Sequence, residues 1–135
     1  RQMRYFNNFY AQLGISDKFS FALLFDVGAQ QRPNNTLSVW FGGGMLAKYT
    51  VNDRITLAAR SEYYSDPDGI IIPTGTVNNF QTLSASANLD VVLTANLLWR
   101  LEARWFSSRD AIYPTENAAP RLTDGFVVTS LAFSF

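Results

Sequence analysis

The stretch that decides the fold is residues 97–105, which read LLWRLEARW. Its odd-numbered positions are all apolar, whereas Arg100, Glu102 and Arg104 occupy three successive even-numbered positions. Successive side chains of a β-strand point to opposite faces, so this alternation predicts a strand with one apolar and one charged face.

The same period of two extends over most of the chain. It is clear in residues 19–28, 54–64, 80–93 and 127–135. It is weaker in residues 37–49, where Trp40 and Leu46 fall on the polar side, and weakest in residues 5–13. The sequence therefore predicts an all-β protein with about seven strands and no helix.

The predicted connections alternate in length. Three are tight: residues 15–17, residues 51–53 and the turn around Ala95. Three are longer, at residues 31–36, 65–79 and 107–125, and the last two are rich in Pro, Gly, Asn and Asp. This order is typical of an antiparallel up-and-down meander with turns at one rim and loops at the other, as in transmembrane β-barrels.

Composition excludes several classes of function. The 135 residues have 11 basic and 11 acidic side chains, no histidine and no cysteine. The balanced charge does not favour a nucleic-acid partner. Without His or Cys we expect neither a metal site nor a cofactor. No apolar run approaches the roughly 18 residues that a membrane helix needs.

Period two alone does not separate a membrane barrel from a soluble, lipocalin-like meander with its apolar face inward. Three features favour the membrane barrel: the aromatic end of the chain, charges in mid-strand, and aromatic residues near strand ends. On the apolar face Trp99 lies toward the turn rim, and Tyr63 and Trp105 lie toward the loop rim, as in the two aromatic girdles of a barrel.

The charged positions would then line a polar lumen. They are Arg60, Glu62, Asp90, Arg100, Glu102 and Arg104. A turn centred on Ala95 places Asp90 opposite Arg100 and Asn88 opposite Glu102. These pairs either stiffen the wall or select ions. With Lys18, Lys48, Arg54 and Asp26 counted, six basic and four acidic side chains give this face +2, too little for strong anion selectivity.

Two further motifs have structural interpretations. Gly42-Gly43-Gly44 lacks the Lys-Ser/Thr of a phosphate loop, so a bend, a bulge or room for a bulky neighbour such as Trp40 is favoured. The carboxylates of residues 66–69, Asp-Pro-Asp-Gly, suggest calcium only weakly and fit a turn. The following residues 70–72, all Ile, would fold into the lumen as a partial plug or contact a partner.

Seven strands do not make a bacterial single-chain barrel, which has an even number of eight or more. The chain also opens without an initiator methionine. We therefore expect residues 1–135 to be a single β-barrel domain that forms the carboxy-terminal part of a larger barrel.

Three segments resemble the OmpL-like family of β-barrel porins of Gram-negative bacteria: residues 60–69 (RSEYYSDPDG), 96–105 (NLLWRLEARW) and 126–135 (FVVTSLAFSF). The chain departs from the family pattern at residues 103–106, where a Tyr and an acidic residue are expected. The resemblance implies the outer membrane as location, with its lipid as a partner. In such barrels the assembly machinery recognises the last strand, here through Leu131, Phe133 and Phe135.

The functional expectation is a porin-like channel for passive diffusion of small hydrophilic solutes or ions. One alternative is a non-conducting structural or adhesive barrel that binds partners through residues 65–79 and 107–125. Another is a soluble carrier of an apolar ligand. Catalysis is not expected, because Glu62 and Glu102 each have an arginine two residues away. The arginine keeps the carboxyl group ionised, and an ionised carboxylate is a poor general acid.

Overall fold

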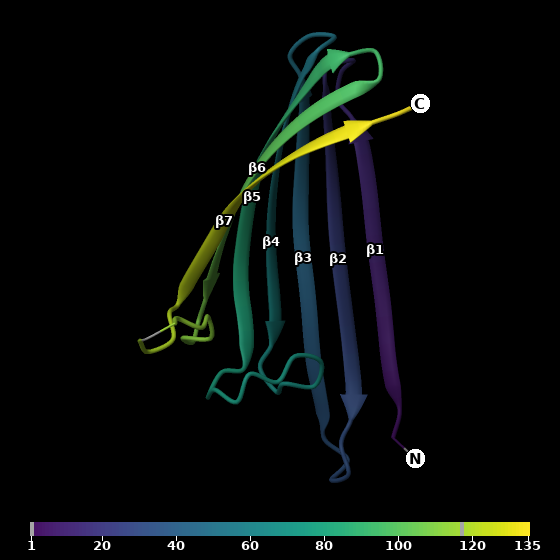
Figure 1. Ribbon diagram of the computed structural model, residues 1–135. Coiled ribbons are helices and arrows are strands. Elements are labelled where there is room, and N and C mark those ends of the chain that lie inside the picture. Colours follow the sequence, from purple (N-terminus) through teal and green to yellow (C-terminus); the bar gives the residue numbers. More distant parts are fainter. Residues whose placement is uncertain (1, 117) are drawn as a thin grey trace.

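Seven antiparallel strands form one sheet in the computed structural model, which describes residues 2–116 and 118–135. The strands are adjacent in chain order, and none of the described residues is helical (Figure 1). Their bounds are β1 Arg4–Gly14, β2 Phe19–Gln31, β3 Leu37–Thr50, β4 Ile55–Asp66, β5 Phe80–Thr94, β6 Leu97–Ser108 and β7 Thr123–Phe133. The predicted up-and-down all-β architecture is thus confirmed.

The connections divide the molecule into two rims. The short turns lie together at the top of Figure 1 and the longer loops at the bottom. Two of the turns are fixed by a side-chain acceptor: Ser16 Oγ accepts from the Phe19 N–H at 3.1 Å, and Asn52 Oδ1 accepts from the Ile55 N–H at 2.9 Å. Such local hydrogen bonds let a short polar segment reverse the chain.

The register puts nearly all even-numbered strand residues on one face of the sheet and nearly all odd-numbered ones on the other. Paired residues have the same parity in every strand pair except at Thr94–Leu97, as in Asp26–Gly42 and Gly44–Glu62. The predicted opposition of Asp90 to Arg100 is confirmed. One irregularity, between Val92 and Thr94, lies beside the β5–β6 turn.

The strand ends differ from the predicted ones in two ways that affect the charge count. β7 begins at Thr123, four residues earlier than expected, and β4 extends to Asp66. Lys18 and Arg54 lie in turns outside the strands. Relative to the sequence count, the polar strand face loses these two cations and gains Arg4 and two carboxylates, Asp66 and Asp124. Its predicted excess of +2 is therefore wrong.

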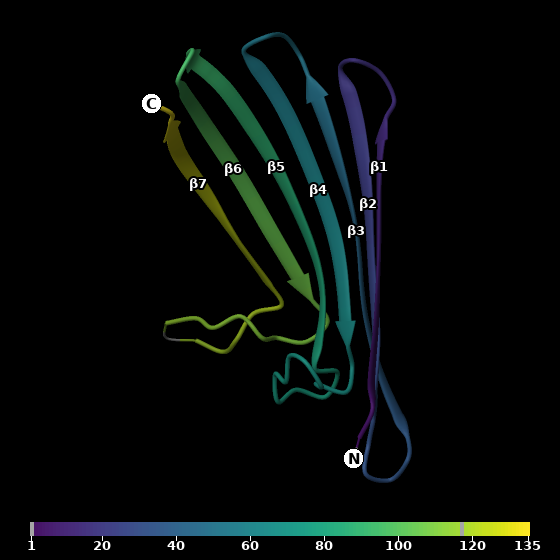
Figure 2. The same ribbon diagram turned by 90° about the vertical axis from the view of Figure 1, so that its right-hand side faces the viewer.

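The sheet is curved, and its even-numbered face is concave. Side chains from β2, β3, β4, β5 and β6 line a common cavity on this face, which a flat sheet would not allow. Both long loops extend to the same side of the sheet (Figure 2). Within residues 2–116 and 118–135, no helix has the length and apolar character needed to cross a membrane.

Candidate functional site: the concave polar face

Charge is completely segregated between the two faces of the strands. All eleven charged residues within the strand bounds are even-numbered, so all lie on the concave face. They are Arg4, Asp26, Lys48, Arg60, Glu62, Asp66, Asp90, Arg100, Glu102, Arg104 and Asp124. The six residues predicted to line a lumen belong to this set. With five basic and six acidic side chains, this face is close to neutral.

Three of the predicted residues form an ion cluster across β4 and β6. Glu62 accepts from the Arg60 guanidinium through Oε1 and from Arg104 Nη2 through Oε2, the latter at 3.0 Å. The Arg104 guanidinium also lies 5.2 Å from the centre of the Phe106 ring. Two guanidinium groups therefore share one carboxylate, which leaves one positive charge in excess.

A second pair lies nearer the turn rim. The Asp90 carboxylate accepts from Arg100 Nε at 2.7 Å and from Arg100 Nη2 at 2.5 Å, which is the bidentate geometry of a strong ion pair. Asn88 and Glu102 face each other in the register, as predicted. No side-chain hydrogen bond joins those two in the part of the chain that the structure describes.

Small residues make room for large ones on the concave face. A Cβ at Gly28 would lie 2.1 Å from the Trp40 ring, so Trp40 packs over Gly28 and is only 4% exposed. A Cβ at Gly42 would lie 3.0 Å from the Tyr64 ring, and one at Gly44 would lie 2.9 Å from Glu62 Cγ. The glycine run thus accommodates Tyr64 and Glu62 in an unbroken register, without a bulge; the suggested room for Trp40 comes from Gly28 instead.

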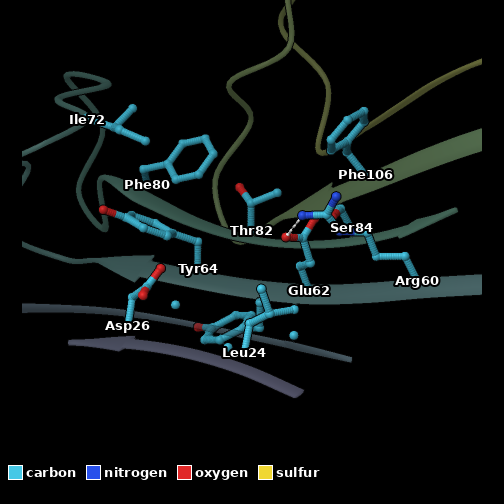
Figure 3. Close-up of a pocket in the computed structure, with 14 residues that line it drawn as sticks. Leu24, Asp26, Arg60, Glu62, Tyr64, Ile72, Phe80, Thr82, Ser84 and Phe106 are labelled. Atoms are coloured by element: carbon cyan, nitrogen blue, oxygen red, sulfur yellow. Dashed lines mark hydrogen bonds and ion pairs between the residues drawn. The ribbon is translucent and has the colours of Figure 1, made fainter. Parts of the chain in front are cut away.

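A cavity of about 340 Å³ lies on this face toward the loop rim (Figure 3). Asp26, Arg60, Glu62 and Tyr64 contribute to its wall, together with the apolar side chains of Leu24, Phe80 and Phe106. Ile72 of the β4–β5 loop also lines it, so part of the triple isoleucine folds over the concave face. The size lies within the ~300–1,000 Å³ typical of small-molecule sites.

Asp66 explains why the β4–β5 loop bends inward. Its side chain is fully buried and accepts from the backbone N–H groups of Ile70, Ile71 and Ile72 at 3.0, 2.7 and 2.8 Å. The Gly69 N–H donates to the Asp66 carbonyl at 3.1 Å, and Gly69 has a φ of +61°. The Asp-Pro-Asp-Gly motif is therefore a turn whose first carboxylate caps the following segment.

Polar contacts join the three loops of this rim. Arg32 of the β2–β3 loop pairs with Asp68 of the β4–β5 loop at 2.9 Å. The Asp110 carboxylate of the β6–β7 loop accepts from the Asn78 side chain at 2.8 Å and from the Asn78 N–H at 2.7 Å. These hydrogen bonds from Asn78 hold the pKa of Asp110 below its usual value.

The predicted aromatic residues, together with Leu131 and Phe133 of the terminal strand, lie on the face opposite the concave one. Tyr63, Trp99 and Trp105 occupy odd-numbered strand positions, and Trp99 Nε1 donates to Thr129 Oγ1 at 2.7 Å. Trp99 and Trp105 stand six residues apart, which is about 20 Å along a strand. Leu131 and Phe133 share this face with exposures of 66% and 62%, and Phe135 follows the end of β7.

The alternating pattern does not single out the residues of the cavity and of the loop rim. Asp26 is one of many charges at even-numbered positions, and no motif marks Asn78. The only available signal for Asp66 was its place directly before a Pro-Asp-Gly turn, which favours an acceptor for the following N–H groups.

A meander with a charged concave face and an uncharged, apolar convex face is the architecture of a porin-like β-barrel wall. It does not favour an apolar-ligand carrier, whose cavity would be lined by the apolar face. Over residues 1–135 the chain matches the family described as "Putative beta-barrel porin-2, OmpL-like", and it belongs to that family. No curated protein and no solved structure matches the chain.

Proposed function

We propose that the chain forms part of the wall of a pore in the outer membrane of a Gram-negative bacterium, through which small hydrophilic solutes and ions diffuse passively. The observation that carries this proposal is the segregation of every strand charge to the concave face. A charged side chain is costly in lipid and stable beside water, so the concave face borders the lumen and the convex face borders lipid. Family membership supports the same type of protein.

The mechanism involves no chemical step. Solutes pass according to size and charge, and the ion cluster Arg60–Glu62–Arg104 together with the Asp90–Arg100 pair supplies the charges they meet. Because these groups largely neutralise one another, we expect weak selectivity between small cations and anions. The inward-folded segment 70–72 narrows the passage at the loop rim.

The test is conductance of the native protein in planar bilayers, with KCl gradients to obtain the ion selectivity. We expect stepwise openings with a small reversal potential. Arg100→Gln should shift that potential toward cation preference, whereas Arg121→Gln in the β6–β7 loop should not. Absence of conductance at any voltage in correctly inserted protein would overturn the proposal.

The loop rim favours a second candidate, a non-conducting barrel that binds partners outside the cell. The long loops are held together by the Asn78–Asp110 contact, and Val77 beside it is 95% exposed. An ordered loop with an exposed apolar side chain is suited to protein binding. In this case deletion of residues 74–77 should abolish partner binding and leave membrane permeability unchanged, and the protein should show no conductance before or after the deletion. In the pore, conductance should be present and should survive the deletion.

We also propose that the barrel-assembly machinery recognises β7 through Leu131, Phe133 and Phe135. All three are exposed, and the rings of Phe133 and Phe135 lie 6.3 Å apart. Polar replacement of Phe133 and Phe135 should lower the amount of protein inserted in cells while leaving refolding in detergent unchanged. Equal insertion of the variant would contradict this role.

A further inference from the structure

The cavity on the concave face has opposite charges at its two ends. In Figure 3, Asp26 of β2 and Tyr64 lie at one end of the cavity, and Arg60 of β4 lies with Glu62 at the other. β2 and β4 are separated by one strand, and the register places Arg60 level with Ala22, four residues along β2 from Asp26. Two strand spacings across the sheet and four residues along it put the Cα atoms of Asp26 and Arg60 about 16 Å apart.

The acidic end has no basic partner within the described residues. Asp26 Oδ1 accepts a hydrogen bond from the uncharged amide of Asn8, and no Arg or Lys of residues 2–116 and 118–135 lies within 4 Å of its carboxylate. Its negative charge is therefore available to a cationic group in the cavity.

The basic end has hydrogen-bond donors without acceptors among the described residues. Glu62 is shared between Arg60 and Arg104, which leaves an excess positive charge. The Nε atoms of both arginines are buried and have no acceptor among the described residues. An unpaired buried donor costs free energy, which an incoming carboxylate would recover.

The middle of the cavity is apolar with a few hydroxyl groups. The rings of Tyr64 and Phe80 meet edge to face at 5.9 Å, and Ile72 lies above them. Thr82 and Ser84 add hydroxyl groups to the same wall. An apolar side chain and a polar backbone would both find partners there.

We propose that this cavity is a binding subsite for short peptides with free termini, with the carboxylate at Arg60 and the ammonium group at Asp26. Of the charged side chains that line the cavity, two are acidic and one is basic, and the Arg104 guanidinium next to the cavity compensates by pairing with Glu62. The local charge is therefore close to zero, so a zwitterion fits the cavity better than a simple anion. An extended tripeptide spans about 10 Å, and the Arg60 side chain, which reaches to the Glu62 carboxylate, covers much of the remaining distance. A single α-amino acid is too short to reach both ends. The proposal rests on the pore function, since the peptide would reach the subsite through the lumen.

The test uses Gly-Phe-Gly as probe, with binding to the native protein in detergent followed by saturation-transfer NMR titration. N-acetylation or C-terminal amidation of the probe should each weaken binding about fivefold, because each removes one partly exposed ion pair. Free phenylalanine should bind more weakly than the tripeptide. Equal affinity of the tripeptide and both blocked forms would overturn the proposal, as would the absence of binding.

Two substitutions test which end of the peptide binds at Asp26 and which binds at Arg60. Asp26→Asn should abolish the preference for a free amino terminus only, and Arg60→Gln the preference for a free carboxylate only. Asp124→Asn and Arg121→Gln, which alter an exposed ion pair outside the cavity, are the matched controls and should leave both preferences intact. Asp26→Asn is nearly isosteric, so it remains informative if Arg60→Gln fails to fold.

Conductance of the same preparations in KCl separates this inference from the proposed pore. Conductance without peptide binding would overturn the proposed peptide subsite and would still support the proposed pore. Binding without conductance would overturn the pore and leave a peptide-binding site in a closed barrel.

Discussion

The two faces of the sheet share one backbone but carry opposite kinds of side chain. On the concave face, Arg60, Arg100 and Arg104 pair with carboxylates. Glycines on this face make space for Trp40, Tyr64 and Glu62. On the convex face no strand residue is charged, and large side chains such as Phe133 remain exposed. The contrast shows that the face to which a strand residue points decides whether a charged side chain is tolerated there.

The largest effect should come from a charge placed on the wrong face. Ala87, in the middle of β5, points to the convex side, and its neighbour Asn88 points to the concave side opposite Glu102. Ala87→Arg should destabilise the protein in lipid by about 2–4 kcal/mol, the cost of a cation at the bilayer midplane. Asn88→Arg should cost far less, and urea titrations of both variants in vesicles measure the difference. Equal costs would mean that the faces are not divided between lipid and water.

A smaller effect should follow from a single methyl group on the concave face. Gly28→Ala forces a Cβ into the Trp40 ring, and overpacking of this kind costs about 1–3 kcal/mol. Gly43→Ala is the matched control, since its Cβ would meet the Phe25 ring at 3.5 Å, an ordinary contact. The free energy of unfolding and the Trp40 emission measure the effect. A neutral Gly28→Ala would show that Trp40 does not pack over Gly28.

The Asp90–Arg100 pair should contribute still less to stability. Arg100 is nearly half exposed, so solvent screens the pair and we expect a coupling of about 0.5–1 kcal/mol. A double-mutant cycle of Asp90→Asn and Arg100→Gln measures it. A coupling several times larger would mean that the concave face is dry, contrary to a water-filled lumen.

The smallest effect should be local and depend on pH. The pKa of Asp110 is lowered by hydrogen bonds from Asn78, so the loop contact is fully present at neutral pH. It is lost only as the pH falls through this lowered pKa, below about pH 4, where ordinary aspartates protonate. The protection factor of the Asn78 backbone amide, which is the intrinsic exchange rate divided by the observed one, should fall in that range in the native protein. In Asp110→Ala, which has no side-chain acceptor, protection should be low at all pH values; high protection in that variant would show that the carboxylate does not hold the loop.

The period of two predicts the seven strands, and the alternation of short and long connections predicts their order. The short turn at Ala95 predicts that Asp90 faces Arg100. The turn lengths fixed the antiparallel register, because a short turn leaves few alternative pairings. The cavity could not be predicted, since it depends on curvature and on loop contacts between residues far apart in sequence. The Asn78–Asp110 contact spans 32 residues, and the inward bend at Ile72 depends on hydrogen bonds to the buried Asp66. No alternating pattern encodes such contacts.

The assignment of the convex face to lipid is tested most directly by tryptophan fluorescence in brominated lipids. The chain has three tryptophans, with Trp99 and Trp105 on the convex face and Trp40 buried on the concave face. In single-tryptophan variants of the native protein we expect quenching of Trp99 and Trp105, with Trp40 spared. Quenching of Trp40 with the other two spared would reverse the faces and contradict the pore.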